Sequence, residues 1–353
     1  MTSVARRHSG EPARSNHGDA ARERTERMRR SPQYRAGKFH NPVPASQASP
    51  NLRGVVADWR ASRGAARRPA HPIPIVTATP EPALDGLHVT WLGHATSLVE
   101  IEGRRLLLDP VWSQRCSPSH LAGPKRLHPM PYGLEKVANV DAIVISHDHY
   151  DHLDLPTVRS LTRLSDAPFV APLGVGAHLH GWGVPEERIV ELDWNESTII
   201  HDVRLVATPA RHFSGRGLSR DGTLWSSWVI AGPTRRLFYS GDTGYFDRFA
   251  SIGAEHGPFD VTLIQVGAYS EGWPDIHVTP EQGVRAHLDV RGGLLIPVHW
   301  ATWVLAMHPW AAPVERVLAE AEQHDVRVAV PRPGQRVDVD NPPEVDGWWR
   351  AIS

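Results

Sequence analysis

The chain has 353 residues, 41% of them apolar, which is enough to bury a core in one large α/β domain with a tail or in two smaller domains. Its net charge of −1 combines a strongly basic segment over the first 70 residues with an acidic remainder, which argues against nucleic-acid binding by the body. The single cysteine, Cys116, excludes an intramolecular disulfide framework and a zinc site built on cysteines, and no apolar run approaches the roughly 18–20 residues that span a bilayer.

The N-terminal part of the chain differs in composition from the rest. Residues 1–50 are rich in Arg, Ser and Pro and poor in large apolar residues, so we predict a basic, disordered or loosely docked arm with a transient helix over 20–30. Residues 51–85 are predicted to be a docking segment followed by a Pro-rich linker, and residues 86–353 the folded domain. We expect a cytoplasmic protein. A basic arm is usually only solvated, with peripheral contact to an anionic membrane as the alternative.

The folded domain contains both strand and helix patterns. Short runs rich in β-branched residues predict strands at 87–92, 97–101, 105–108, 142–146, 203–207, 237–240 and 294–298, of which the second and third form a hairpin. Capping residues and apolar periodicity predict helices at 154–164, 279–287 and 312–324. This order indicates a layered α/β fold.

A cluster of metal-ligand residues follows the predicted strand 142–146. It contains His147, His149, Asp151 and His152. An isolated histidine usually has an ordinary structural role, but four such groups beside one buried strand need partners at once, which a metal ion supplies. Imidazole and carboxylate at this density suit zinc, with manganese or iron as alternatives.

Three later predicted strands each lead to a further candidate ligand. These residues are His212, Asp242 and His299. If the strands are neighbours, all seven side chains meet at one edge, which is too many for a single catalytic zinc ion. We therefore predict two divalent ions about 3.5–4 Å apart that share a hydroxide. The first ion is assigned to His147, His149 and His212, the second to Asp151, His152 and His299, and Asp242 is assigned as the bridge.

The motif His147-x-His149-x-Asp151-His152, followed by His212, Asp242 and His299, resembles the metallo-β-lactamase superfamily. The resemblance implies a four-layer αβ/βα sandwich with a dinuclear site at the edge between two sheets. Further segments resemble the N-acylphosphatidylethanolamine-hydrolysing phospholipase D group, from about residue 86 to 333. They lie at 109–113, 117–118, 123–126, 224–228, 241–245, 257–260, 267–269 and 299–300.

The resemblance to these phospholipases implies further functional residues. Asp109 and His277 join Asp151 as catalytic candidates. Asp109 either orients a ligand imidazole or serves only as a turn former. His277 either donates a proton or contacts phosphate, or it is a plain loop residue. Candidate substrate contacts are Lys125, Arg126, Tyr269 and Trp300, although a Lys-Arg pair in a Pro- and Gly-rich loop is usually only solvated, and a tryptophan such as Trp300 is more often buried in the core. One departure concerns residues 270–273, which read Ser-Glu-Gly-Trp where the phospholipases have Glu-Pro-Arg-Trp, so one basic group is absent.

The expected function is that of a dinuclear phosphodiesterase acting on a small-molecule or phospholipid phosphodiester. A lactonase or amide hydrolase would use the same metal site on a different bond, so it stays an alternative. A non-enzymatic scaffold stabilised by metal is the remaining alternative. It is disfavoured because structural zinc sites are normally closed by four protein ligands.

Overall fold

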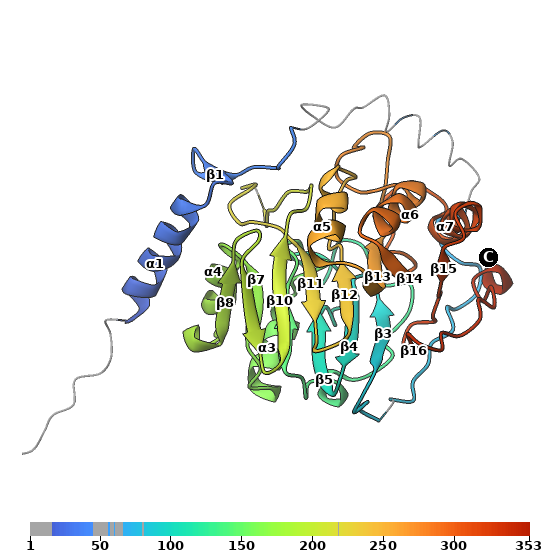
Figure 1. Cartoon of the computed structure of the whole chain (residues 1–353), viewed down its shortest axis with the longest axis horizontal. Helices are drawn as coiled ribbons and strands as arrows, with labels where there is room; N and C mark the ends of the chain where they lie inside the picture. Colours follow the sequence, from blue (N-terminus) through green and yellow to red (C-terminus); the bar gives the residue numbers. More distant parts are fainter. Residues whose placement is uncertain (1–15, 45–55, 57–59, 61–65, 80, 218) are drawn as a thin grey trace, which may run out of the picture.

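The computed structural model describes residues 16–44, 56, 60, 66–79, 81–217 and 219–353. Two seven-stranded sheets face each other, and helices cover their outer faces (Figure 1). This arrangement confirms the predicted αβ/βα sandwich. None of the helices in the described ranges has the length and apolar character that a bilayer crossing requires.

The first sheet is built mainly from the N-terminal half of the folded domain. Its strands, in spatial order, are β16 (Arg336–Asp338), β3 (Leu87–Gly93), β4 (Thr96–Ile101), β5 (Arg104–Leu108), β6 (Ala142–Val144), β7 (Phe169–Pro172) and β8 (Ile189–Leu192). Strands β5 to β8 pair in parallel, while β4 is antiparallel to both of its neighbours. Helices α3 (Leu155–Leu164) and α4 (Val175–Gly181) contribute to the core on the outer face of this sheet.

The second sheet comes from the C-terminal half. Its strands, in spatial order, are β15 (Arg327–Val328), β14 (Gly292–Val298), β13 (Phe259–Gln265), β12 (Arg236–Tyr239), β11 (Ser227–Ala231), β10 (Val203–Thr208) and β9 (Ser197–Ile200). Strands β12 to β15 are parallel, whereas β11 is antiparallel to β10 and β12, so β10 and β12 point the same way. Helices α5 (Arg248–His256), α6 (Pro280–Asp289) and α7 (Ala312–Gln323) lie together on one side of it (Figure 1). The described residues also form the short 3-10 helices η1 (Leu134–Lys136), η2 (Glu186–Arg188) and η3 (Arg350–Ile352).

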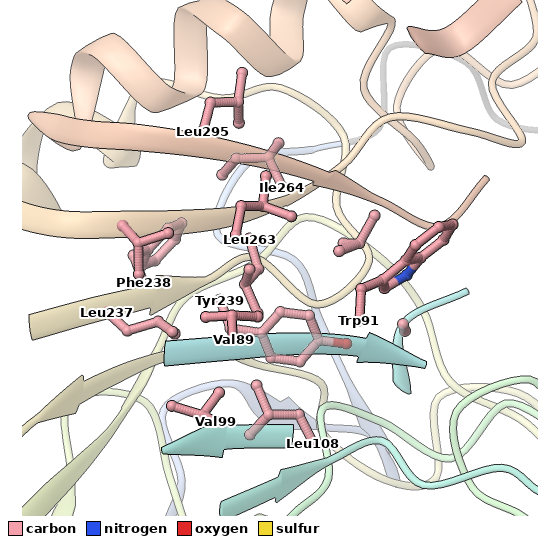
Figure 2. Close-up of a cluster of buried hydrophobic side chains, with 14 of the residues drawn as sticks. Val89, Trp91, Val99, Leu108, Leu237, Phe238, Tyr239, Leu263, Ile264 and Leu295 are labelled. Carbon is pink, nitrogen blue, oxygen red and sulfur yellow. The ribbon is translucent and has the colours of Figure 1, made fainter. Parts of the chain in front are cut away.

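Alternating side chains of the first sheet serve two separate cores. In β5, Leu106 and Leu108 belong to the core between the sheets, and Leu107 belongs to the core under α3 and α4. This follows from the period of two along a strand. Figure 2 shows Leu108 among the side chains of the inter-sheet core, with Tyr239 and Leu263 of the second sheet. Because both faces of the strands are covered, the strands read as continuous apolar runs in the sequence.

The predicted strands and helices are confirmed, with shifts of a few residues at their ends. Asp154 caps α3 by accepting from the backbone N–H of Thr157, and Thr279 forms a capping box with Gln282 at the start of α6. The elements that were not predicted include strands β7, β8, β9, β11, β13, β15 and β16 and helices α4 and α5. In β13, polar residues interrupt the apolar pattern, among them Thr262, which is buried and hydrogen-bonds His287 at 2.8 Å.

The expectation that the four ligand-bearing strands are neighbours is wrong. Strand β6 belongs to the first sheet, and β13 separates β12 from β14 in the second. The sequence could not show this, because a ligand at a strand end carries no signal of which sheet holds the strand. The ligands still meet because the two sheets face each other and these strands end at the same edge.

The described part of the N-terminal arm forms regular structure docked on the body. It consists of α1 (Asn16–Arg30) and a hairpin of β1 (Tyr34–Arg35) and β2 (Lys38–Phe39). The buried guanidinium of Arg24 donates to Glu191 at 2.5 Å. Composition alone could not show this docking, because it depends on charged partners far away in the sequence. The predicted docking segment at 52–59 lies outside the described residues except for Val56, and the domain boundaries stay a prediction.

Trp228 offers a test of how the two sheets are joined. It is fully buried in β11, and its indole N–H donates to the carbonyl oxygen of Ile145, just beyond β6, at 3.1 Å. Replacing Trp228 with Phe keeps an aromatic ring but leaves that carbonyl unpaired, so we expect a loss of about 1–3 kcal/mol in the free energy of unfolding.

Urea denaturation in the presence of a chelator measures this loss without a contribution from bound metal. The control is Ile199→Ala on the edge strand β9, where the side chain is 65% exposed and the change should stay within about 0.5 kcal/mol. Equal stability of Trp228→Phe and the native protein would contradict the proposed role of the hydrogen bond.

Candidate metal centre

The candidate site lies where parallel strands of both sheets end. It is reached by the loops that follow β3, β5, β6, β10, β12, β13 and β14. In the same order, these loops carry His94, Asp109, the cluster from His147 to His152, His212, Asp242, His277 and His299. Loops at the carboxyl ends of strands are positioned by a rigid scaffold. The structure therefore brings together all seven residues that the sequence analysis assigned to metal.

Three imidazoles form the first group of candidate ligands. Nε2 of His147 lies 2.9 Å from Nδ1 of His149, which in turn lies 3.3 Å from Nε2 of His212. Burial lowers the pKa of each of these three histidines, so they are neutral at neutral pH. Neutral imidazole is the form that binds a metal ion.

The second group surrounds the carboxylate of Asp151. Its Oδ2 lies 3.6 Å from Nε2 of His152 and 3.5 Å from Nε2 of His299. Burial opposes ionisation of Asp151, but the adjacent His152 and hydrogen bonds from the neighbouring histidines hold its pKa well below the ordinary value. The carboxylate is therefore charged, as a metal ligand must be.

Asp242 lies between the two groups. Its Oδ2 is 3.9 Å from Nε2 of His147 in the first group, and it is 3.1 Å from Nε2 of both His152 and His299 in the second. The preceding Gly241 has φ of 54°, and a Cβ there would lie 2.8 Å from the carbonyl oxygen of Ser226 and 2.9 Å from Cβ of Ser146, which follows β6 of the first sheet. A glycine is needed at this position to bring Asp242 so close to the other sheet.

Unpaired polar atoms show that these residues suit a metal ion. Nε2 of His152, Nε2 of His299 and Oδ1 of Asp242 are buried and make no hydrogen bond of ordinary geometry, although both nitrogens lie 3.1 Å from Oδ2 of Asp242. Burying such atoms without a partner is costly, and a bound cation removes the cost. The nitrogen and carboxylate donors match the ligands that zinc and similar divalent ions take.

Hydrogen bonds on the far side of the rings orient two of the ligands. Nδ1 of His152 lies 2.7 Å from Oδ2 of Asp109, and Nδ1 of His212 lies 2.9 Å from the carbonyl oxygen of Ile276. Since these oxygens only accept, each Nδ1 carries a proton, and Nε2 is the nitrogen that faces the site. Metal-binding histidines are commonly oriented in this way.

Asp109 combines the two roles that the sequence left open. It is fully buried just after β5, with φ of 38°, and it accepts hydrogen bonds from the backbone N–H of Ser146 at 2.7 Å, from the Ser146 hydroxyl and from Tyr239. It therefore fixes the chain before the ligand cluster and also orients His152. Asp109 lies behind the candidate ligands and is a positioning residue.

His277 contacts the site from the loop after β13. Its Nδ1 donates to the carbonyl oxygen of Ala268 at 2.7 Å, and its Nε2 lies 3.1 Å from Oδ2 of Asp242. The ring also lines the pocket that opens onto the site. This location allows Nε2 either to approach a metal ion or to exchange a proton with a bound molecule.

His94 was not predicted as a site residue. It follows β3, and its Nε2 lies 2.8 Å from Oδ2 of Asp151, with its ring centroid 3.7 Å from that of His299. Burial lowers its pKa to about 3, so the ring is neutral. The available signal was the same as for the other ligands, since His94 follows a predicted strand by two residues.

A pocket of about 460 Å³ opens onto the candidate ligands. His149, Asp151, His212, Asp242 and His277 are exposed to it on one side. Its other walls are mostly apolar and come from Phe213, Ala268, Trp273, Ile276 and Leu305, with Arg220 as a cation. The volume lies in the range of small-molecule sites.

The four candidate substrate contacts lie outside the lining of this pocket. Lys125 is exposed elsewhere, and Arg126 is buried with its guanidinium bonded to the carbonyl oxygens of Val111 and Ser113. Tyr269 stacks on His308 with ring centroids 4.4 Å apart. The indole of Trp300 is buried in the core between Trp91 and Trp348. The sequence placed them near the ligands but could not show the direction of their side chains.

Comparison with known proteins agrees with this geometry. Residues 104–300, more than half of the chain, match the beta-lactamase superfamily domain. The chain belongs to the metallo-β-lactamase superfamily. The structure of Igni18, a metallo hydrolase from Ignicoccus hospitalis, is similar to this chain with a TM-score of 0.55 at 21% identity, over 71% of this chain and 97% of that one.

Two relatives show which proteins of the metallo-β-lactamase superfamily this chain is similar to. An uncharacterized protein of Mycobacterium tuberculosis is 55% identical over 91% of this chain and 88% of its own length. The N-acyl-phosphatidylethanolamine-hydrolyzing phospholipase D 1 of Caenorhabditis elegans is 39% identical over 66% of this chain and 68% of its own length. The protein is therefore a metallo-β-lactamase superfamily hydrolase similar to these phospholipases.

Asp109 allows a test of ligand positioning. Replacing it with Asn keeps the size but puts an N–H₂ group in place of an accepting oxygen beside His152, Ser146 and Tyr239. We expect metal affinity to fall by about 10–100-fold, measured by competition with a chromophoric chelator. The control is Asp166→Asn, at an exposed position near β7, which should bind metal like the native protein. Unchanged affinity in Asp109→Asn would contradict the assigned role.

Proposed function

We propose that this protein is a dinuclear metal-dependent phosphodiesterase. The observation that carries the proposal is the location of Asp242, whose Oδ2 lies within 3.1–3.9 Å of imidazole nitrogens of both ligand groups. A carboxylate between two sets of three ligands suits a bridge between two ions. The histidine-rich donor set supports zinc, and metal analysis would distinguish zinc from manganese or iron.

The residues divide into ligands and groups that act on the substrate. His147, His149 and His212 would hold one ion, and Asp151, His152 and His299 the other, with Asp242 shared between them. When bound, two such metal ions lower the pKa of water and neutralise charge on phosphoryl oxygens. The hydrophobic walls of the pocket exclude bulk water and so strengthen these charge interactions.

His277 is the proposed proton donor to the leaving group. Its Nδ1 proton is held by the carbonyl oxygen of Ala268, which fixes the plane of the ring. Its Nε2 faces the pocket beside Asp242, within reach of a bound phosphodiester. A proton held at Nε2 would pass to the departing alkoxide oxygen.

Arg220 is the proposed contact for the substrate's phosphate. It is the only Lys or Arg among the described residues that line the pocket. Its guanidinium carbon lies 4.0 Å from the ring centroid of Phe213, which directs the exposed side chain along the pocket wall. Arg220 would therefore supply the positive charge that the phospholipases place in the segment corresponding to residues 270–273.

The similarity to the Caenorhabditis elegans phospholipase, at 39% identity, supports a phospholipid among the possible phosphodiesters. The apolar walls at Phe213, Trp273, Ile276 and Leu305 are compatible with the part of an acyl chain nearest the headgroup. Contact with an anionic membrane through the arm and a cytoplasmic location stay predictions.

The test is metal-dependent hydrolysis by the purified full-length chain. We expect turnover of bis(p-nitrophenyl) phosphate, loss of turnover with a chelator and recovery on adding Zn²⁺. Replacing Asp242 with Asn should abolish turnover and reduce the bound metal, because the bridge is lost, while Asp166→Asn should behave like the native protein. N-acylphosphatidylethanolamine vesicles analysed by mass spectrometry test the phospholipid.

The same experiment separates the alternatives. Hydrolysis of a lactone or amide but of no phosphodiester would replace the proposal with the alternative hydrolase. Loss of stability on chelation, without turnover of any of these compounds, would indicate the scaffold. Full activity of Asp242→Asn would refute the bridging role.

Arg220 gives a prediction about substrate binding. The change Arg220→Ala removes a charged hydrogen bond to phosphate, so we expect KM for an anionic phosphodiester to rise about tenfold, with kcat nearly unchanged. Steady-state kinetics at low ionic strength measure the effect. Arg159→Ala, an exposed position on α3, is the matched control, and an identical KM in the two variants would contradict the assignment.

A further inference from the structure

The N-terminal arm lies directly behind one of the candidate ligands. After α1 and the hairpin of β1 and β2, the described part of the arm continues to Pro44. The hairpin lies above the ends of the strands, on the side where α5 also lies (Figure 1). Phe39 of the hairpin is 2% exposed and packs in a small core with Ala210, Leu224 and Trp225. These three residues border the loop that carries His212.

Asn41 of the arm binds the backbone of His212 on both sides. Its Nδ2 donates to the carbonyl oxygen of His212 at 2.7 Å, and the backbone N–H of His212 donates to its Oδ1 at 2.9 Å. The indole N–H of Trp225 donates to the same Oδ1 at 3.2 Å, which holds the amide in this orientation. Asn41 thus satisfies both main-chain groups of a candidate ligand.

The second sheet does not hold the backbone of His212 in place, and Asn41 does so instead. Strand β10 ends at Thr208, so His212 lies in a loop without ladder hydrogen bonds. An unpaired backbone group there would leave the ligand free to move or would be costly to bury. By contrast, His299 follows β14 directly, and its N–H donates to the carbonyl oxygen of His94 at 2.9 Å.

Two more contacts join the arm to the same loop. A guanidinium N–H of Arg211 donates to the carbonyl oxygen of Pro44 at 2.9 Å, and the N–H of Phe39 donates to the carbonyl oxygen of Asp221 at 2.8 Å. The two contacts lie on either side of residues 212–220. This segment carries both His212 and the pocket residue Arg220.

We infer that the N-terminal arm is a working part of the metal centre and that Asn41 is a positioning residue for the ligand His212. Asn41 holds the His212 backbone, and the Ile276 carbonyl holds its ring, so Nε2 is fixed beside His147 and His149. The inference rests on the proposed dinuclear site, and it assigns Asn41 to the first of the two ions.

The test is the affinity and stoichiometry of Zn²⁺ binding to the full chain, measured by titration against a chromophoric chelator. Asn41→Ala should weaken one of the two ions about 10–100-fold and leave the other unchanged, because only the first group contains His212. Asn41→Asp keeps the size and an accepting oxygen but replaces the donor with a charged oxygen that repels the His212 carbonyl, so it should weaken the same ion without leaving a cavity.

Two control variants separate positioning from docking of the arm. Lys38→Ala changes an exposed residue of the same hairpin, and Arg24→Ala removes the buried ion pair with Glu191, remote from His212. Both should bind two ions like the native chain. Thermal unfolding of the metal-free variants is recorded in parallel, because a purely structural role would lower the melting temperature and leave both dissociation constants unchanged.

The possible outcomes are distinct. Native affinity for both ions in Asn41→Ala and Asn41→Asp would overturn the inference. An equal loss in Arg24→Ala would overturn the assignment to Asn41, because the docked arm as a whole would then hold the ligand. A native chain that binds fewer than two ions would instead refute the proposed dinuclear site. Selective weakening of one ion in both Asn41 variants supports the inference.

Discussion

The buried carboxylate of Asp109 joins the parts on which the candidate site depends. One sheet contributes the N–H and hydroxyl of Ser146 and the ring of His152, and the other contributes the hydroxyl of Tyr239. Tyr239 packs in the core between the sheets (Figure 2), and its hydroxyl donates to the carboxylate that orients His152. The packing of that core therefore constrains the position of a candidate ligand. A carboxylate with this many donors is stabilised although it is fully buried. The relative position of the two sheets and the direction of a ligand ring are thereby fixed by a single group.

Much of the fold and of the candidate ligand set could be predicted from the sequence. Strands covered on both faces read as unbroken apolar runs, and polar residues directly after such runs marked His147, Asp242 and His299. Strand β13 was missed because Asp260 and Thr262 interrupt its pattern, and Thr262 is buried only because His287 pairs with it. Which strands are neighbours could not be predicted, since it depends on how the sheets face each other.

The direction of side chains and the contacts of the arm were also beyond the sequence. Trp300 and Arg126 follow recognisable motifs, yet one belongs to the aromatic core and the other bonds buried carbonyls. The arm has the composition of a solvated tail, but Arg24, Phe39 and Asn41 each meet a partner more than a hundred residues away in the chain. Composition averages over such single contacts and therefore hides them.

The spacing of the ligands along the chain has a consequence for biosynthesis. The cluster His147–His152 leaves the ribosome well before Asp242, the proposed bridge, and His299, the last candidate ligand of the second group. At about 5–20 residues per second, the interval is on the order of ten seconds. During that time four closely spaced candidate ligands are exposed without the geometry that selects an ion, so the identity of an ion bound at that stage would be decided by its availability in the cell.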